Sequence, residues 1–290
     1  MVESEEKQYI DLVQSILNNG TLEEGRNGKT YVKIGETMRF SLENGKIPLL
    51  TTKKVAWKTC LKELLWFISG KTDNKILKDQ KVHIWDANGS RSFLDSRNLQ
   101  NLEEDDLGPV YGHQWRHFNA SYSNCNADYT GKGVDQLKLI IKSLKNRDFS
   151  RRLIMCAWNP CQIQEMALPP CHVLVQFHVT EGKKLSCSLY QRSGDVGLGV
   201  PFNIASYSFL THLLAYHCDL EAKEFIHHIG NAHIYEEHKE PLIEQIKRDP
   251  IKFPNLEIKR KYDTIDNYTL QDFKIKNYAS HSSIKMKMRV

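Results

Sequence analysis

Residues 169–203 read PPCHVLVQFHVTEGKKLSCSLYQRSGDVGLGVPFN, and they contain two strand-like runs joined by a polar turn. The runs are residues 173–180 and 185–190, and the glycine within residues 181–184 suits a tight turn, so we predict a β-hairpin. Two prolines stand directly before Cys171, and they stiffen the entry to the first strand because proline restricts its own backbone and that of its neighbour. The hairpin would bring Arg192 back beside Cys171.

Cys171 has two interpretations at this position. A lone cysteine beside a strand is most often a buried structural residue. A guanidinium close to a thiol instead favours the thiolate, which is the reactive form. Polar residues follow the return strand directly, namely Arg192, Ser193, Asp195 and Asn203. An ordinary core has no use for such a run, so we favour the reactive cysteine.

The composition is that of a globular protein of 290 residues, of which 40% are hydrophobic, with a formal charge of +5. This charge suits an anionic ligand, and a solvated basic surface explains it equally well. No apolar run approaches the ~20 residues of a membrane helix, and the acidic N-terminus does not resemble a signal peptide. Seven scattered cysteines, an odd number, indicate a reducing compartment. We predict no membrane association and a cytoplasmic protein, with the nucleus as the alternative location.

Hydrophobic spacing predicts both helices and strands along the chain. The expected helices are residues 5–17, 53–69, 204–218 and 238–248, and a further helix with Val134, Leu137, Ile141 and Leu144 on one face. The expected strands outside the hairpin are residues 31–42, 153–158, 256–260 and 271–276. Glycine and proline within residues 83–118 indicate loops that line a cleft, and the polar segments 89–106 and 119–131 resemble surface insertions. No repeat or linker divides the chain, so we predict one domain, residues 1–290.

Glu63 lies within the largely apolar helix 53–69. It is either an outward-facing charge or a buried carboxyl whose raised pKa suits proton transfer. Gly70-Lys71-Thr72 ends this helix and lacks the earlier glycine of a phosphate-binding loop, because Leu65 stands there. No glycine-rich dinucleotide fingerprint is present, so we predict no NAD. Four histidines within residues 225–238 lack the spacing of a metal-ligand set, so we predict no metal.

Four motifs together resemble the thymidylate synthase family: PPCH at residues 169–172, YQRSGD at 190–195, LGVPFNIASY at 198–207 and GNAHIY at 230–235. The resemblance extends from Tyr9 to Val290, and its LKELLWF segment favours the buried interpretation of Glu63. It implies reductive methylation of dUMP to dTMP, with 5,10-methylenetetrahydrofolate consumed as carbon and hydride donor and released as dihydrofolate. It also implies an α+β fold, in which a mixed sheet has helices on one face and packs its other face on a second subunit.

The resemblance implies roles for individual residues. The catalytic residues would be Cys171, which adds to uracil C6, and Glu63, Tyr111, His172 and Asn203, which manage proton transfer. The dUMP ligands would be Arg26, Arg192, Ser193, Gly194, Asp195, Asn203, His233 and Tyr235, with Arg151 and Arg152 contributed across the homodimer interface. The folate-binding residues would be Ile84, Trp85, Asn88, Asp195, Leu198, Gly199, Phe202 and Arg289.

The sequence departs from the family pattern at three places. The loop that carries Arg26 is about one residue shorter than usual, Asn231 stands where an aspartate is common, and Arg289 replaces a small residue. A pyrimidine hydroxymethylase, acting on dUMP or dCMP, is the alternative function because it shares the fold and Cys171. Trp85 and the apolar closing tail argue against it. A nucleic-acid-binding protein would need a basic stripe with interleaved aromatic residues, and the sequence does not indicate one.

Overall fold

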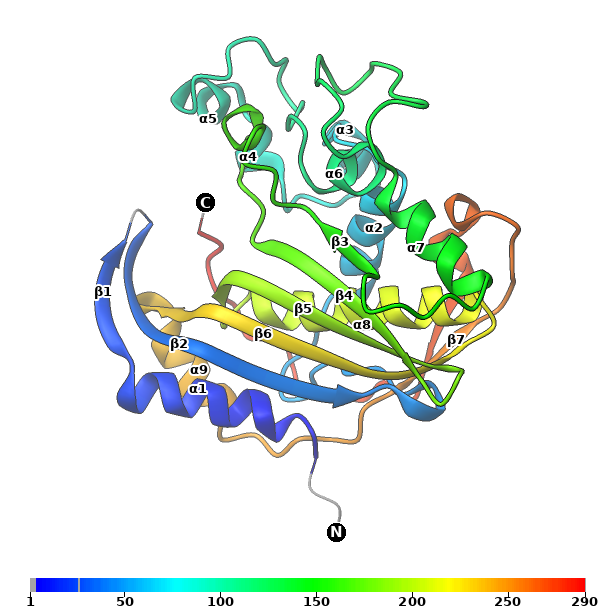
Figure 1. Ribbon diagram of the computed structural model, residues 1–290. Coiled ribbons are helices and arrows are strands. Elements are labelled where there is room, and N and C mark those ends of the chain that lie inside the picture. The colour runs from blue at the N-terminus through cyan, green and yellow to red at the C-terminus, as the bar shows by residue number, and fades with distance from the viewer. Residues whose placement is uncertain (1–3, 26, 290) are drawn as a thin grey trace.

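The computed structural model describes residues 4–25 and 27–289, so Arg26, predicted to bind phosphate, lies outside the described residues. Within these residues, a six-stranded sheet has the order β1-β2-β6-β5-β4-β3 (Figure 1). Its strands are β1 (Thr21–Gly25), β2 (Gly28–Ser41), β3 (Ile154–Cys156), β4 (His172–Thr180), β5 (Lys184–Asp195) and β6 (Glu221–Tyr235). Only β5 and β6 run parallel, so the sheet is mixed and the predicted α+β class is confirmed.

The remaining elements are helices and a small second sheet. The helices are α1 (Lys7–Asn19), α2 (Trp57–Ile68), α3 (Lys75–Asp79), α4 (Asp86–Gly89), α5 (Arg91–Ser96), α6 (Tyr111–His117), α7 (Gln136–Lys145), α8 (Gly199–His217) and α9 (Lys239–Gln245). The second sheet pairs β7 (Asn255–Ile258) with β8 (Phe273–Lys276), close to the two late strands predicted. That the whole chain forms one domain stays a prediction.

The predicted hairpin is β4 and β5. Val175 pairs with Leu189 and Phe177 with Cys187, and all four side chains are buried, which is the alternation that a half-buried strand requires. The N–H group of Arg192 donates to the carbonyl of Cys171 at 2.9 Å. The structure therefore places Arg192 beside Cys171, as the sequence predicted.

Helix α8 connects β5 to the parallel strand β6 and lies along one face of the sheet (Figure 1). Its side chains are buried on all sides, as expected for a helix that is apolar all round. The helix begins at Gly199, five residues before the predicted start. Pro201 fits its first turn because the N–H group that proline lacks has no partner there in any helix. Asn203 therefore stands on the first turn of α8.

The opposite face of β3, β4 and β5 exposes apolar side chains. By the strand register, Tyr190 and Leu174 are neighbours on that face, and Ile154 lies on it one step further along. Ile154 and Tyr190 are each 45% exposed, whereas Val175 and Phe177 on the inner face are buried. Proteins in water rarely expose several neighbouring apolar side chains on one sheet face, so this face is a candidate contact surface.

Several sequence predictions were wrong in detail. Residues 111–117 form helix α6 instead of a loop, and Trp115 lies in the core as expected. Residues 89–106 include α5 and the buried Leu94, so they are more than a surface insertion. Val134 precedes α7 and is 46% exposed, so it does not share the buried face of that helix. In α5 and α6, tertiary burial overrode weak local signals.

Candidate active site

Many of the predicted site residues that the structure describes gather at one edge of the sheet. The parallel strands β5 and β6 end there, β4 begins there, and the first turn of α8 follows. A pocket of about 340 Å³ opens at this edge. Its lining residues are Gly25, Asn27, Gly28, Thr30, Arg192, Ser193, Asn231, His233 and Tyr235. The topology thus brings together residues that lie more than two hundred positions apart in the sequence.

Cys171 is half-buried and its backbone is tied to Tyr111 on α6. The N–H group of Cys171 donates to the Tyr111 hydroxyl at 2.7 Å, and that of His172 lies 3.4 Å from the same oxygen. Burial, together with the neighbouring Cys171, raises the pKa of Tyr111. The phenol therefore stays protonated, and its O–H group can donate a hydrogen bond to a group bound beside Cys171.

Arg192 is anchored to the two residues that precede Cys171. Its Nε donates to the carbonyl of Pro170 at 2.9 Å and its Nη2 to that of Pro169 at 3.0 Å. Its guanidinium also lies over the Trp158 ring, 5.5 Å from the ring centre. These contacts fix a permanent positive charge at the entrance to β4, where it lines the pocket.

Glu63 on α2 accepts a hydrogen bond from the indole Nε1 of Trp85 at 2.7 Å. Burial raises the pKa of Glu63 to about 7, although the bond from Trp85 opposes the shift. A carboxyl that titrates near neutral pH can both take up and release a proton. The structure therefore favours the interpretation of Glu63 as a buried carboxyl over that of an outward-facing charge.

His172 is a neutral imidazole. Burial lowers its pKa to about 4, although its hydrogen bond with Asn203 opposes the shift. Its Nδ1 is buried and has no hydrogen-bond partner among the described residues. An orphaned polar atom of this kind is costly unless a ligand or water satisfies it.

A buried relay of polar side chains holds the amide of Asn203. Its Oδ1 accepts from Gln191 Nε2 at 2.9 Å, and Gln191 Oε1 lies 2.8 Å from His227 Nε2. Burial lowers the pKa of His227 to about 3, so this imidazole is neutral and its Nε2 donates to Gln191. The relay fixes which way each amide faces. Sequence reasoning assigned no role to Gln191 or His227, although Gln191 stands within the YQRSGD motif.

Other predicted nucleotide residues lie at the ends of β5 and β6. Ser193 pairs with Asn231 in the sheet, and His233 Nδ1 lies 3.1 Å from Asn231 Oδ1. A Cβ on Gly194 would lie 3.0 Å from side-chain atoms of Ile229 and Val200, so a larger residue there would require these neighbours to move. Tyr235, the last residue of β6, lines the pocket beside His233.

Most of the predicted folate-binding residues lie in two segments of the chain. Ile84, Trp85 and Asn88 belong to the segment around α4, and Leu198, Gly199 and Phe202 to the start of α8. Asp195 Oδ1 accepts from the N–H groups of Gly197 at 2.9 Å and Leu198 at 3.3 Å, which shapes the turn into α8. The ring centres of Trp85 and Tyr111 are 6.2 Å apart, so the segment around α4 lies beside a predicted catalytic residue.

Two groups of predicted residues are not brought into the pocket. Arg151 and Arg152 are exposed in the turn before β3 and do not line the pocket of the same chain. Arg289 binds Glu237, with 2.7 Å between its Nε and Glu237 Oε1. These three arginines could therefore bind a ligand as predicted only in the site of a partner subunit, or they have a different role.

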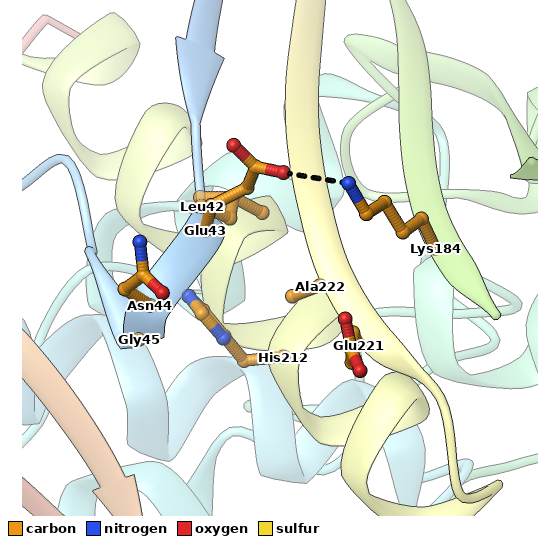
Figure 2. Close-up of a pocket in the computed structure, with 8 residues that line it drawn as sticks. All are labelled: Leu42, Glu43, Asn44, Gly45, Lys184, His212, Glu221 and Ala222. Carbon is orange, nitrogen blue, oxygen red and sulfur yellow. Dashed lines mark hydrogen bonds and ion pairs between the residues drawn. The ribbon is translucent and has the colours of Figure 1, made fainter. Parts of the chain in front are cut away.

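A second pocket, of about 440 Å³, lies at the other end of the sheet (Figure 2). Glu221 and Lys184, which begin β6 and β5, line it with His212 and Glu43. In Figure 2 Lys184 bridges toward Glu43, and their charged atoms are 3.3 Å apart. The catalytic candidates stand at or beyond the opposite ends of these strands, so this pocket is separate from the site.

Within residues 4–25 and 27–289, no group of three or more His, Cys, Asp or Glu side chains could hold a metal ion. None of the helices described is long and apolar enough to cross a membrane. The cytoplasmic location stays a prediction.

Comparison with known proteins adds the family to this geometry. The family model described as thymidylate synthase matches residues 7–290. The chain belongs to the thymidylate synthase family. It is 52% identical over 286 residues to a human protein named thymidylate synthase, covering 98% of this chain and 91% of that protein. It is 50% identical over 296 residues to the thymidylate synthase of Saccharomyces cerevisiae, covering 99% of this chain and 97% of the yeast protein.

Some members of the thymidylate synthase family that match this chain are longer. The chain is 50% identical over 288 residues to the bifunctional dihydrofolate reductase-thymidylate synthase of Leishmania major, covering 99% of this chain and 55% of that protein. The chain thus spans about half the length of the bifunctional relatives it matches.

The raised pKa of Glu63 predicts a pH-dependent effect on stability. The folded protein holds a proton on Glu63 between pH 4.5, its usual pKa, and about pH 7, whereas the unfolded chain has lost it. Stability contributed by this group therefore falls as pH rises through that window. The side chain of Glu63→Gln cannot ionise. The urea midpoint of this variant, measured relative to that of the wild type, should therefore be higher at about pH 8 than at about pH 5. Glu23→Gln, at an exposed position on β1, is the control. An equal difference at both pH values would contradict the assignment.

Proposed function

We propose that the protein converts dUMP to dTMP and consumes 5,10-methylenetetrahydrofolate. The observation that supports this most directly is the grouping of Cys171, the anchored Arg192 and the oriented Asn203 at one edge of the sheet. Membership of the thymidylate synthase family supports the same reaction. Each of the three side chains answers one need of the substrate: activation of the ring, charge on the phosphate, and recognition of the base.

Carbon C5 of uracil is a poor nucleophile until another group adds at C6. The Cys171 thiolate would form the bond to C6, and the electron pair of the C5–C6 double bond would move onto C5. The hydrogen bonds that Tyr111 and Arg192 make with the backbone of Cys171 and Pro170 would position the sulfur for this attack. C5 would then attack the one-carbon unit of the folate, and the C5 proton would leave. The bond between that carbon and the folate nitrogen would break, a hydride from the folate would complete the methyl group, and the thiolate would depart as the C5–C6 double bond re-forms.

The bound folate supplies a one-carbon unit and then a hydride, and it leaves as dihydrofolate. The residues near α4 fit such a group, because Asn88 Nδ2 is buried without a partner among the described residues. Trp85, which is 6% exposed, would pack against the flat ring. Ile84, Leu198, Gly199 and Phe202 would complete the wall, with Asp195 facing the polar edge of the pterin.

Proton transfer falls to groups whose charge states the structure sets. Glu63, with its pKa of about 7, would exchange protons with the base through water. Tyr111 stays protonated and would donate to the group that removes the C5 proton. His172 stays neutral, and its orphaned Nδ1 would bind an ordered water.

The phosphate would lie in the pocket beside Arg192 and Ser193. His233 and Tyr235 would bind the sugar hydroxyl, since both line the same pocket at the end of β6. Arg26, which lies between β1 and β2 in the sequence, would also bind the phosphate. Two arginines of a second subunit would supply the remaining positive charge. A phosphate dianion suits several guanidinium groups because their forked donors match its oxygens.

The assay follows dihydrofolate absorbance with purified protein, dUMP and methylenetetrahydrofolate. We expect dihydrofolate in step with dTMP, and none from Cys171→Ser, which should still bind dUMP because the phosphate and base contacts remain. A hydroxymethylase would release a hydroxymethyl nucleotide and no dihydrofolate, which would contradict the proposal. Activity retained by Cys171→Ser would place the nucleophile elsewhere, with the strand cysteines Cys156 and Cys187 tested next.

The relay predicts which base the protein accepts. Uracil offers an N3–H donor beside an O4 acceptor, and cytosine offers an N3 acceptor beside an amino donor. The orientation of the Asn203 amide therefore determines which of the two bases it can bind. Gln191→Glu would accept from Asn203 Nδ2 and turn that amide around. We expect the kcat/KM for dUMP to fall about tenfold or more and the relative use of dCMP to rise. Asn203→Asp should shift preference the same way. Unchanged preference in both variants would show that Asn203 does not read the base.

We further propose a homodimer in which the exposed sheet face of β3–β5 is covered and Arg151 and Arg152 reach the partner's phosphate. Mixing Cys171→Ser subunits with Arg152→Ala subunits should then restore activity, because one of the two sites would combine an intact cysteine with an intact partner arginine. Each heterodimer should carry one complete site, so its activity should approach about half that of a wild-type dimer. Heterodimers that form, as shown by differently tagged subunits, and stay inactive would contradict the cross-subunit assignment.

A further inference from the structure

The C-terminal tail, residues 279–289, runs in extended form to the edge of the sheet where the site lies (Figure 1). Hydrogen bonds attach it to the body of the protein along its length. They run from the His281 N–H group to Thr51 O at 2.7 Å, from Arg248 Nη1 to Ser282 O at 2.7 Å, and from His238 Nε2 to Lys287 O at 2.8 Å. The tail is therefore a strap with defined attachment points.

The last attachment is an ion pair between Arg289 and Glu237. Arg289 Nε donates to Glu237 Oε1 at 2.7 Å, and Arg289 Nη2 bonds the other oxygen, Oε2. The two side chains are 36% and 33% exposed. An exposed ion pair is usually weak, but a pair that uses both carboxylate oxygens has a defined geometry and is among the stronger ones.

This ion pair lies beside the pocket lined by Arg192, Ser193 and His233, which we call the nucleotide pocket. Arg289 and Glu237 line a small cavity of about 260 Å³, which shares Asn27, Gly28 and Tyr235 with the nucleotide pocket. The tip of the β1–β2 hairpin and the end of β6 thus form part of both spaces. A tail that is released at Arg289 would open this side of the site.

The tail also touches the turn that leads into α8. Met286 Sδ lies 3.2 Å from where a Cβ on Gly197 would be, so the side chain packs on this turn. His238, which holds the Lys287 carbonyl, has its Nδ1 3.7 Å from Asp195 Oδ1. The position of the tail is therefore coupled to Asp195, the residue that we place beside the pterin.

We propose that Arg289 and Glu237 form a latch, a positioning pair that holds the tail over the folate side of the site and so sets how readily folate enters and dihydrofolate leaves. The inference rests on the proposed function. It gives a role to Arg289, which stands where the family usually has a small residue. The latch acts through the tail and does not touch the reacting atoms.

The test compares four variants in two assays. The variants are Arg289→Gln, Glu237→Gln, the double neutral variant, and the charge swap Arg289→Glu with Glu237→Arg. The control is Glu257→Gln, which removes a similarly exposed ion pair with Lys276 on the small sheet. One assay is the rate at which trypsin cuts after Lys285 and Lys287, read by mass spectrometry. The other separates KM for the folate from kcat.

Either single variant should be cut about two- to fivefold faster than wild type, and its KM for the folate should rise by a similar factor while kcat changes less. The double neutral variant should be no worse than either single variant, and the swap should recover most of the loss. About 0.5 M KCl should move the wild type toward the variants, because salt screens an exposed pair.

Effects that match those of Glu257→Gln, or that add in the double neutral variant, would overturn the latch. So would a charge swap that recovers nothing. The protease assay needs no turnover, so it tests the latch even if the protein makes no dTMP. Failure of the proposed function and failure of the latch are therefore distinguished by separate measurements.

Discussion

The site depends on the pairing of β4 with β5 at the end where Arg192 meets Cys171. At this end the Arg192 N–H group donates to the Cys171 carbonyl, and the register of the ladder shifts between His172 and Leu174. A slip of one residue would turn every side chain of β5 to the other face. Arg192 would leave the pocket, and Gln191 would lose both Asn203 and His227. The Arg192 guanidinium also donates hydrogen bonds to the carbonyls of Pro169 and Pro170, the two residues before Cys171. These bonds stabilise the start of β4 beside the end of β5.

Burial then sets the charge states of the groups gathered around that pairing. It raises the pKa of Glu63 to about 7 and lowers that of His172 to about 4, so the carboxyl titrates near neutral pH and the imidazole does not. The same effect keeps Tyr111 protonated and His227 neutral. Proton exchange is thereby concentrated on Glu63, while the neighbouring groups keep fixed donor and acceptor roles. These roles follow from desolvation more than from any single ion pair.

Features that depend on local pattern were predicted from the sequence, and those that depend on distant partners were not. The hairpin and the apolar helix α8 follow from strand alternation and apolar runs. The mixed sheet was implied by the resemblance to the thymidylate synthase family, because hydrophobic spacing did not predict β6, the strand that runs parallel to β5. Helix α6 was missed because its glycine-containing sequence is a weak helix former, and burial of its side chains stabilises it. The relay was missed because Gln191 and His227 lie 36 positions apart, and only the parallel register of β5 and β6 makes them neighbours. The contact of Arg289 with Glu237 is equally invisible to local patterns.

In the proposed reaction Cys171 attacks the base in a site completed by folate. A dUMP analogue with fluorine at C5 would trap this step, because fluorine cannot leave as a proton and the covalent complex would accumulate. The measurement is intact-mass and peptide mass spectrometry after incubation with this analogue and methylenetetrahydrofolate. We expect a mass increase equal to nucleotide plus folate, located on the peptide that contains Cys171. No adduct, or an adduct on another cysteine, would contradict it.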